Sequence, residues 1–484
     1  MLQEELSLSP HAGHSRDERQ HVAAARPARA EATRLADEAA HGLARNRPDL
    51  SAHIVITVPQ KLALAALLGV AAGLALALPM TAWVMLADLL SLMFLIGAIF
   101  RAALALLGGP PPRGDAGACN ETLPVYTLIV PLCREANVLP RLARTLLLLD
   151  YPRDRLDVKF VVEADDLETV AVAEELEGRG PFEVIRVPEG HPRTKPRACN
   201  YALNFARGEF TVIYDAEDRP ERDQLRKAVA AFRASRANIA CLQARLNFFN
   251  ARENALTKLF ALDYALWFDV LLPALDRLGV PMPLGGTSNH FRTAVLRKLG
   301  GWDPFNVTED ADLGIRIAQL GMRVAMLDST TFEEAPVRLG VWLRQRSRWM
   351  KGYMQTWLVH TRQPFALVRR TGGRGFLAFH LFIGGSVAAA LATMPLWLIF
   401  LLSAAISQEG PTATSLSMLA TGNLLLTALA IASPTRRGWQ NLAPYGLAVP
   451  LYWAMISVAA WRGLGQLVTR PFHWEKTPHG LSRQ

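Results

Sequence analysis

Long apolar stretches without a charged residue dominate both ends of this sequence. Residues 62–87 and 89–100 form one pair, separated by Asp88. Three more uncharged stretches lie near the C-terminus, at 375–408, 410–435 and 438–461. A helix needs about 20 apolar residues to cross the hydrocarbon core of a bilayer. The sequence therefore predicts a multi-pass membrane protein and excludes a fully soluble fold.

Composition divides the chain into successive regions. Residues 1–55 are rich in Ala, Arg, Glu and His, which predicts a disordered cytoplasmic tail. Residues 60–108 are expected to form a transmembrane hairpin of two helices, and a Gly/Pro linker follows it. Residues 375–461 are expected to supply three or four further spans, and charge does not decide between these numbers. A C-terminal tail, residues 462–484, completes the chain.

The net charge of +9 has two possible origins. A basic chain can bind nucleic acid, but a charge-only footprint is weak evidence for it. Arginines at 362, 369, 370 and 374 precede an apolar stretch, as cytoplasmic anchors do, so residues 361–374 are expected to be a basic juxtamembrane or interfacial segment. Nucleic acid is therefore not an expected partner. The four cysteines show no CxxC or Cys/His pairing, which agrees with a reducing cytoplasmic compartment.

The polar middle of the chain, residues 120–360, alternates between strand and helix patterns. Helical patterns at 138–149, 221–234 and 310–320 lie between apolar runs. These runs, the expected strands, are 126–130, 158–163, 183–187, 210–214, 238–243 and 323–327. This alternation predicts an α/β domain with a mostly parallel sheet. Ligands of such sheets bind at the carboxyl ends of the strands.

Acidic residues follow two of the expected strands. Asp165 and Asp166 come after the second run, where such a pair is most often a turn or helix cap. Asp215, Glu217 and Asp218 follow the fourth run, and three acids within four residues repel one another. Mg²⁺ or Mn²⁺ bridging to phosphates would relieve that repulsion. The alternative is a solvated acidic turn, and the sequence leaves both open.

Two further motifs lie towards the end of the domain. Asp310, in a Thr-Glu-Asp sequence that opens a helix, is either a first-turn acid or a base that accepts a proton from a hydroxyl. Gln345, Arg348 and Trp349 lie at i, i+3 and i+4, so they share one helix face. An amide, a guanidinium and an indole suit a sugar and a phosphate. An interfacial amphipathic helix would carry the same residues.

The order of these motifs, between apolar stretches, resembles the processive inverting family 2 glycosyltransferases of the cellulose synthase and hyaluronan synthase type. The resemblance covers about residues 120–360 and implies a GT-A-type nucleotide-sugar-binding domain. It implies Asp310 as the general base, and Mg²⁺ or Mn²⁺ held by Asp215 with either Glu217 or Asp218. The implied nucleotide-binding residues are Pro131, Glu135, Asp165, Asp166, Lys195 and Asp215; the implied acceptor and diphosphate residues are Gln345, Arg348 and Trp349.

The same resemblance implies a function. The enzyme would transfer a sugar from a nucleotide sugar, with a UDP-sugar expected, to a growing β-linked polysaccharide. Export of that polymer is also implied, with export partner subunits as candidate partners. The alternative is a single transfer to a lipid acceptor. A transporter with a soluble domain is a remote alternative, because its spans would carry ionisable residues and these carry few. The expected location is the cell (inner) membrane, with the catalytic domain in the cytoplasm and membrane lipid as a partner.

Overall fold

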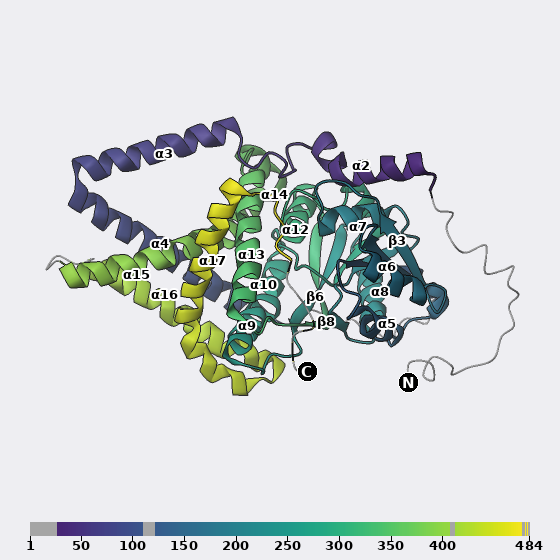
Figure 1. Cartoon of the computed structure of the whole chain (residues 1–484). Helices are drawn as coiled ribbons and strands as arrows, with labels where there is room; N and C mark the ends of the chain where they lie inside the picture. Colours follow the sequence, from purple (N-terminus) through teal and green to yellow (C-terminus); the bar gives the residue numbers. More distant parts are fainter. Residues whose placement is uncertain (1–26, 110–121, 407–411, 477–479, 481, 483–484) are drawn as a thin grey trace, which may run out of the picture.

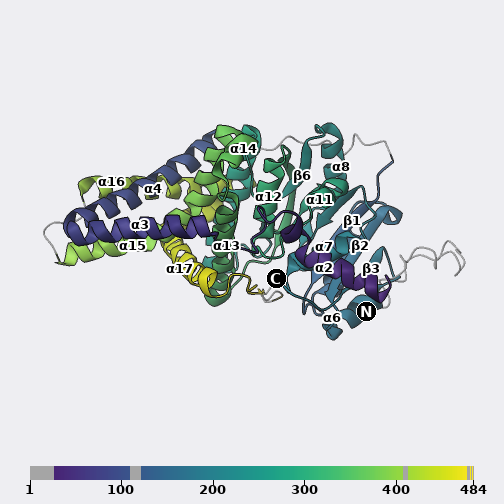
Figure 2. The same ribbon diagram turned by 90° about the horizontal axis from the view of Figure 1, so that it is seen from above.

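The computed structural model describes residues 27–109, 122–406, 412–476, 480 and 482. An α/β domain forms one end of the molecule, and long apolar helices project away from it at the other end (Figure 1). The same separation is evident from above (Figure 2).

A mixed eight-stranded sheet forms the centre of the α/β domain. Its order is β3-β2-β1-β4-β7-β6-β8-β5, and the strands are β1 (Tyr126–Leu132), β2 (Leu156–Glu163), β3 (Phe182–Val187), β4 (Phe210–Ile213), β5 (Arg219–Pro220), β6 (Ile239–Phe248), β7 (Asn289–Arg292) and β8 (Arg323–Glu333). β1 pairs in parallel with β2 and β4, β2 with β3, and β6 with β8. The predicted α/β domain with its six apolar strands is confirmed.

Two strands were not predicted, and one of them changes the sheet. β7 lies antiparallel between β4 and β6, so the sheet is mixed where mostly parallel pairing was expected. Its sequence, Asn-His-Phe-Arg, lacks the apolar run by which the other strands were recognised. Asn289 and His290 are nevertheless buried, and the Nδ1 atom of His290 forms a hydrogen bond with the Tyr126 hydroxyl at 2.7 Å. Short β5 pairs antiparallel with β8.

Helices cover both faces of the sheet. Leu128 and Val130 of β1 join a core with α5, α6 and α8, whereas Ile129 between them joins the opposite core with α7, α9 and α12. This alternation is what a strand buried on both faces requires. The helices of the domain are α5 (Leu139–Leu147), α6 (Leu167–Leu176), α7 (Lys195–Leu203), α8 (Gln224–Ala234), α9 (Ala255–Leu266), α10 (Leu272–Leu278), α11 (Thr293–Lys298), α12 (Glu309–Gln319) and α13 (Leu339–His360).

The N-terminal region is more ordered than predicted. Residues Arg29–Asn46 form α2, which packs against α7, with Ala36 and Ala39 in the core. The following turn is held by Asp303, which accepts hydrogen bonds from the Ser51 hydroxyl at 3.1 Å and the Ala52 amide at 2.5 Å. The expectation of a disordered tail is therefore wrong for residues 29–46, because their small apolar face has a docking site. Residues 1–26 lie outside the described part of the chain.

Five helices in the described part of the chain are long and apolar enough to cross a membrane. α3 (Val58–Ala77) and α4 (Pro79–Leu107) form the N-terminal hairpin. At the C-terminal end, α14 (Pro364–Phe379) is kinked at Gly372, where the backbone is not helical, and then continues through a π-helical turn into α15. α15 (Gly385–Ile406) and α16 (Ala413–Ala432) project alongside α4, whereas α17 (Val449–Thr469) packs along α13 at the junction with the α/β domain (Figure 1).

Candidate active site

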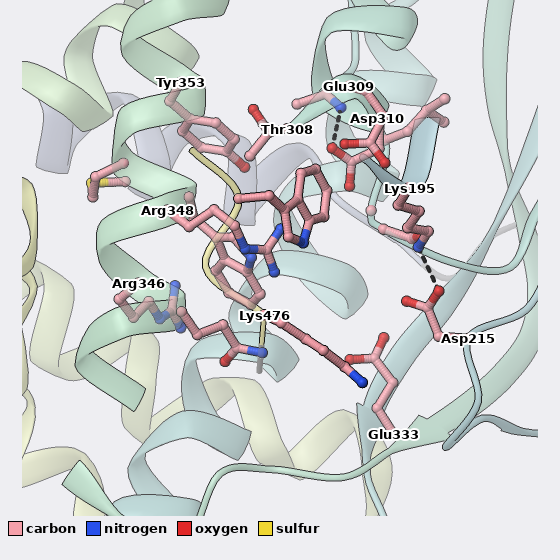
Figure 3. A pocket seen from close by; sticks show the side chains of 18 of the residues that line it. Lys195, Asp215, Thr308, Glu309, Asp310, Glu333, Arg346, Arg348, Tyr353 and Lys476 are labelled. Atoms are coloured by element: carbon pink, nitrogen blue, oxygen red, sulfur yellow. Dashed lines mark hydrogen bonds and ion pairs between the residues drawn. The ribbon is translucent and has the colours of Figure 1, made fainter. Parts of the chain in front are cut away.

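A cavity of about 310 Å³ lies between the carboxyl ends of the strands and the apolar helices. Side chains from β1, α7, α12 and α13 reach it, together with the loop after β4 and the C-terminal segment (Figure 3). Most of the residues predicted to form the site line it: Pro131, Glu135, Lys195, Asp215, Glu217, Asp310, Gln345, Arg348 and Trp349. The fold thus gathers residues that lie up to 218 positions apart in the sequence.

Lys195 connects the loop after β4 to the glycine-rich loop before β7. Its ammonium group donates to Asp215 Oδ1 at 2.5 Å and to the Gly286 carbonyl at 2.8 Å. Burial alone would lower the pKa of Lys195, but the Asp215 and Glu309 carboxylates raise it above its usual value. Lys195 is therefore a fixed positive charge beside Asp215, and it is suited to a phosphate.

Three more acids surround Asp215. Glu217 and Glu333 line the cavity, and burial with the neighbouring carboxylates raises the pKa of both well above the usual range. Asp218 does not line it: this side chain is buried and accepts hydrogen bonds from the Asp215 amide and the Thr287 hydroxyl. The accumulated negative charge and the hard oxygen donors fit a divalent cation.

Glu217 faces the cavity and Asp218 holds the loop, so the geometry favours Glu217 as the second acid beside Asp215. Among the described residues, no three His, Cys, Asp or Glu side chains are gathered closely enough to hold a metal ion. Mg²⁺ and Mn²⁺ sites of phosphate-transferring enzymes commonly use one or two carboxylates, and the substrate phosphates complete them. The donor set therefore fits such a shared site rather than a closed protein cage.

Asp310 lies in the first turn of α12, at the cavity wall. Its Oδ1 accepts the Ala311 amide at 2.8 Å. Burial raises its pKa above the ordinary value for aspartate, while Lys195 and Arg348 act in the opposite direction. Burial and the Asp310 carboxylate raise the pKa of the adjacent Glu309 to about 8. A Cβ at Gly286 would lie 3.3 Å from Asp310 Oδ2, so the glycine loop connects the Lys195 cluster with Asp310.

α13 supplies the opposite wall of the cavity. Gln345, Arg348 and Trp349 all face it, as the helical spacing predicts. The Gln345 Oε1 and Arg348 Nε atoms are buried without a hydrogen-bond partner in the described structure. Polar atoms that are buried without partners carry a free-energy cost, and a bound ligand can remove it.

The C-terminal segment closes one side of the cavity. The Arg348 guanidinium lies 4.5 Å from the centre of the Trp474 ring, and Lys476 forms an ion pair with Glu135 at 3.2 Å. Lys351 of α13 anchors this segment by donating to the carbonyls of Arg470 at 3.2 Å and His473 at 2.8 Å. The cavity is thus completed by residues from the far end of the chain.

Asp165 and Asp166 are the predicted nucleotide-binding residues that do not line the cavity. Asp165 forms a two-point ion pair with Arg193 at 2.5 and 2.7 Å. Asp166 caps α6 and accepts the Arg134 amide at 2.5 Å, which fixes the loop after β1. Both lie at the end of β2, which pairs with β1 and is separated from β4 by β1. Arg193 itself does line the cavity.

Several cavity residues were missed from the sequence. Glu333 ends β8, so the rule that identified the other strand-end acids applies to it as well. Trp267 sits on a π-helical turn that follows α9, and its position has no sequence signal. Arg101 comes from α4, and it appeared only as an interruption of an apolar stretch.

Comparison with known proteins decides the class of this domain. Residues 124–352 match the family profile described as "Glycosyltransferase like family 2". This part of the chain is therefore similar to family 2 glycosyltransferase domains. The GT-A-like fold and the prediction that the protein is a glycosyltransferase are confirmed.

The relatives of this glycosyltransferase extend beyond the α/β domain. "Beta-monoglucosyldiacylglycerol synthase" of Synechocystis sp. is 26% identical over 415 residues, covering 81% of this chain and 83% of that protein. "Probable glycosyltransferase YdaM" of Bacillus subtilis is 26% identical over 291 residues, covering 60% and 68%. A mannosyltransferase from Pyrobaculum calidifontis, solved with GDP-Man and Mn²⁺, has a TM-score of 0.52 at 22% identity and covers 76% of this chain and 98% of that one.

Proposed function

We propose that this protein is a membrane-embedded, inverting glycosyltransferase that moves one sugar from a nucleotide sugar to a lipid acceptor on the cytoplasmic side of the cell membrane. The observation that carries the proposal is the single cavity that joins the acidic sugar-transfer site to the apolar helices. A lipid held among α4, α15 and α17 can present its hydroxyl to that site. The match to "Beta-monoglucosyldiacylglycerol synthase" of Synechocystis covers 81% of this chain, so it extends beyond the α/β domain. This match supports the same acceptor class.

The donor site in this proposal lies between β1, α7 and the loop after β4. Lys195 provides positive charge for the diphosphate, and Arg348 faces it from α13. Asp215 and Glu217 would hold Mg²⁺ or Mn²⁺ with the phosphates, and the ion would supply charge neutralisation for the leaving group. The Mn²⁺ complex of the Pyrobaculum enzyme is consistent with this requirement. Asp165 and Asp166 act through the loops that they hold, by their contacts with Arg193 and the Arg134 amide.

The chemical step follows from the position of Asp310. The acceptor hydroxyl attacks the anomeric carbon and loses its proton to the Asp310 carboxylate. The bond between that carbon and the diphosphate oxygen breaks, and the nucleoside diphosphate leaves with its electron pair. Attack opposite the leaving group converts an α-linked donor into a β-linked product. General-base catalysis of this type contributes about 10²–10⁴-fold to the rate.

The sugar lies between these groups and α13. Trp349 offers a ring face, and the unpartnered Gln345 Oε1 accepts a hydroxyl hydrogen. The Trp349 ring is itself supported by Arg346, whose guanidinium lies 4.6 Å from its centre. These contacts serve one sugar equally well whether the acceptor is a lipid or a polymer, so the acceptor is decided by the rest of the cavity.

The proposal is tested by product analysis. The full chain in nanodiscs made from extracted bacterial lipid is incubated with radiolabelled nucleotide sugars and Mg²⁺ or Mn²⁺. We expect label in a solvent-extractable lipid carrying one sugar, with Lys61→Gln at the exposed start of α3 as a matched active control. The growing β-linked polysaccharide that the sequence resemblance implied would instead appear as a ladder of water-soluble or insoluble products, and that result would reject the lipid acceptor.

A further inference from the structure

A group of residues from the apolar helices also lines the cavity. It includes Arg101 of α4, Ser386 of α15 and Trp453 of α17. Arg101 lies six residues before the end of α4, which corresponds to about 9 Å at 1.5 Å per residue. The end of α4 contacts the α/β domain, because Arg277 donates to the Leu107 carbonyl at 3.1 Å. Arg101 therefore lies at the level where apolar helices meet the catalytic domain.

Arg101 is a buried cation with neutral partners. Arg101 is 4% exposed. Its guanidinium donates to the Gly97 carbonyl at 3.1 Å and to the Ser386 hydroxyl at 2.8 Å. Among the residues that the structure describes, no carboxylate forms an ion pair with it. Asp263, an acid of the cavity wall, is paired directly with Arg346 and acts on Arg101 only at longer range. A buried charge without a direct ion pair is costly, which makes Arg101 a candidate for ligand binding.

Other residues of the cavity wall are apolar and aromatic. The Trp267 and Tyr353 rings lie 6.2 Å apart and nearly parallel, and Leu271 and Ile456 continue the wall towards α17. A ligand that fills the whole cavity must therefore be polar at the reacting hydroxyl and must carry hydrogen-bond acceptors near Arg101. Its remaining part must be compatible with apolar helices.

We propose that Arg101, together with Ser386, binds the ester carbonyl oxygens of a diacylglycerol acceptor and thereby selects the lipid class. This inference rests on the proposed function and names its acceptor. The charge balance favours a neutral ester over a phosphate: the Asp263 carboxylate of the same cavity already offsets part of the Arg101 charge, whereas a phosphate monoester carries nearly two negative charges at pH 7. A guanidinium has five donors, and the partners within the chain use only part of this capacity.

The test compares two acceptors that differ only at the proposed contact. Diacylglycerol and its dialkyl ether analogue share the free hydroxyl and the chains, but the ether lacks both carbonyl oxygens. In nanodiscs, the wild-type enzyme is expected to show about 10-fold or higher kcat/KM for the ester lipid, since a hydrogen bond to a charged group is lost with the ether. Arg101→Gln should reduce the rate with the ester lipid to that with the ether, and Ser386→Ala should reduce it partly.

The control is Arg277→Gln, which alters an exposed arginine of α10 that contacts the end of α4 outside the cavity, and it should keep the ester preference. Nucleotide-sugar binding to Arg101→Gln should match wild type, which verifies its fold. Equal rates of the wild type on ester and ether lipids would overturn the inference even if the variant fails to fold. Equal losses of Arg101→Gln on both lipids, or a preference for phosphatidic acid, would also overturn it. Transfer to no lipid would instead reject the proposed function itself.

Discussion

Opposing influences act on the Asp310 carboxyl. Burial raises its pKa, while the Ala311 amide and the positive charges of Lys195 and Arg348 lower it, and burial is the larger effect. A carboxylate with a raised pKa is a stronger base once it is ionised, because base strength follows pKa. Its place in the first turn of α12 keeps the ionised form accessible near neutral pH.

Replacing Asp310 with Asn should remove the proton acceptor and leave the size of the side chain unchanged. We expect kcat to fall by about 10²–10⁴-fold, because that is the usual contribution of one general base. Donor affinity, measured by nucleotide-sugar titration with Mn²⁺, should change little. A variant that turns over at the wild-type rate would show that another group accepts the proton.

Arg348 offers a test through pH. Transfer should be lost as the pH falls through the pKa of Asp310, since the base must be ionised. Arg348→Gln removes a charge that lowers this pKa, so the acidic limb of kcat/KM should move to higher pH. Arg348→Lys keeps the charge and should leave the limb near its wild-type position. A limb that stays in place in Arg348→Gln would contradict the assigned base.

Glu217 and Asp218, two acids in the loop after β4, have different predicted roles. Glu217→Gln should raise the concentration of Mn²⁺ needed for half-maximal activity, because Glu217 faces the cavity. Asp218→Ala should mainly lower thermal stability, since it leaves the Asp215 amide without its acceptor and removes one of the two acceptors near the Thr287 hydroxyl, at about 1–3 kcal/mol. Mn²⁺ titrations and melting curves of both variants test these roles. If Asp218→Ala raised the Mn²⁺ requirement and Glu217→Gln lowered the stability, the two roles would have to be exchanged.

At the level of secondary structure, strand ends and helix faces position the site. The sequence was informative wherever an element has a strong local pattern, as in the six apolar strands and the i, i+3, i+4 face of α13. It was uninformative where a contact is made only by tertiary packing. β7 is short and polar, α2 is stabilised by docking on α7, and the residues that complete the cavity after position 470 have no periodicity.

The C-terminal segment gives a prediction at the same scale. Lys351→Met removes both hydrogen bonds to the carbonyls of Arg470 and His473, so residues 470–476 should detach more often. We expect faster chymotryptic cleavage after Phe472 and Trp474 and a several-fold higher KM for the donor, because Trp474 and Lys476 no longer complete the cavity. Lys298→Met, on α11 away from the cavity, is the matched control. Unchanged cleavage and KM would mean that Lys351 does not hold the segment.

At the scale of the whole molecule, the catalytic domain and the apolar helices share one cavity. α17 packs along α13, and α4 reaches the domain beside α10, so the acceptor-binding end and Asp310 belong to a continuous surface. Hydropathy predicted the two N-terminal apolar helices and left three or four at the C-terminal end, and it did not predict their convergence on the active site. Arg101 is an example. In the sequence it only ends the uncharged stretch 89–100, and the fold places it in the cavity wall.

The configuration of the product sugar tests the mechanism most directly. The glycolipid made from an α-linked nucleotide sugar is isolated and its anomeric proton is measured by NMR. A single displacement with Asp310 as the base predicts a β-linked sugar, one per lipid. An α-linked product would show that the configuration is retained, and it would contradict the direct attack of the acceptor hydroxyl that the position of Asp310 implies.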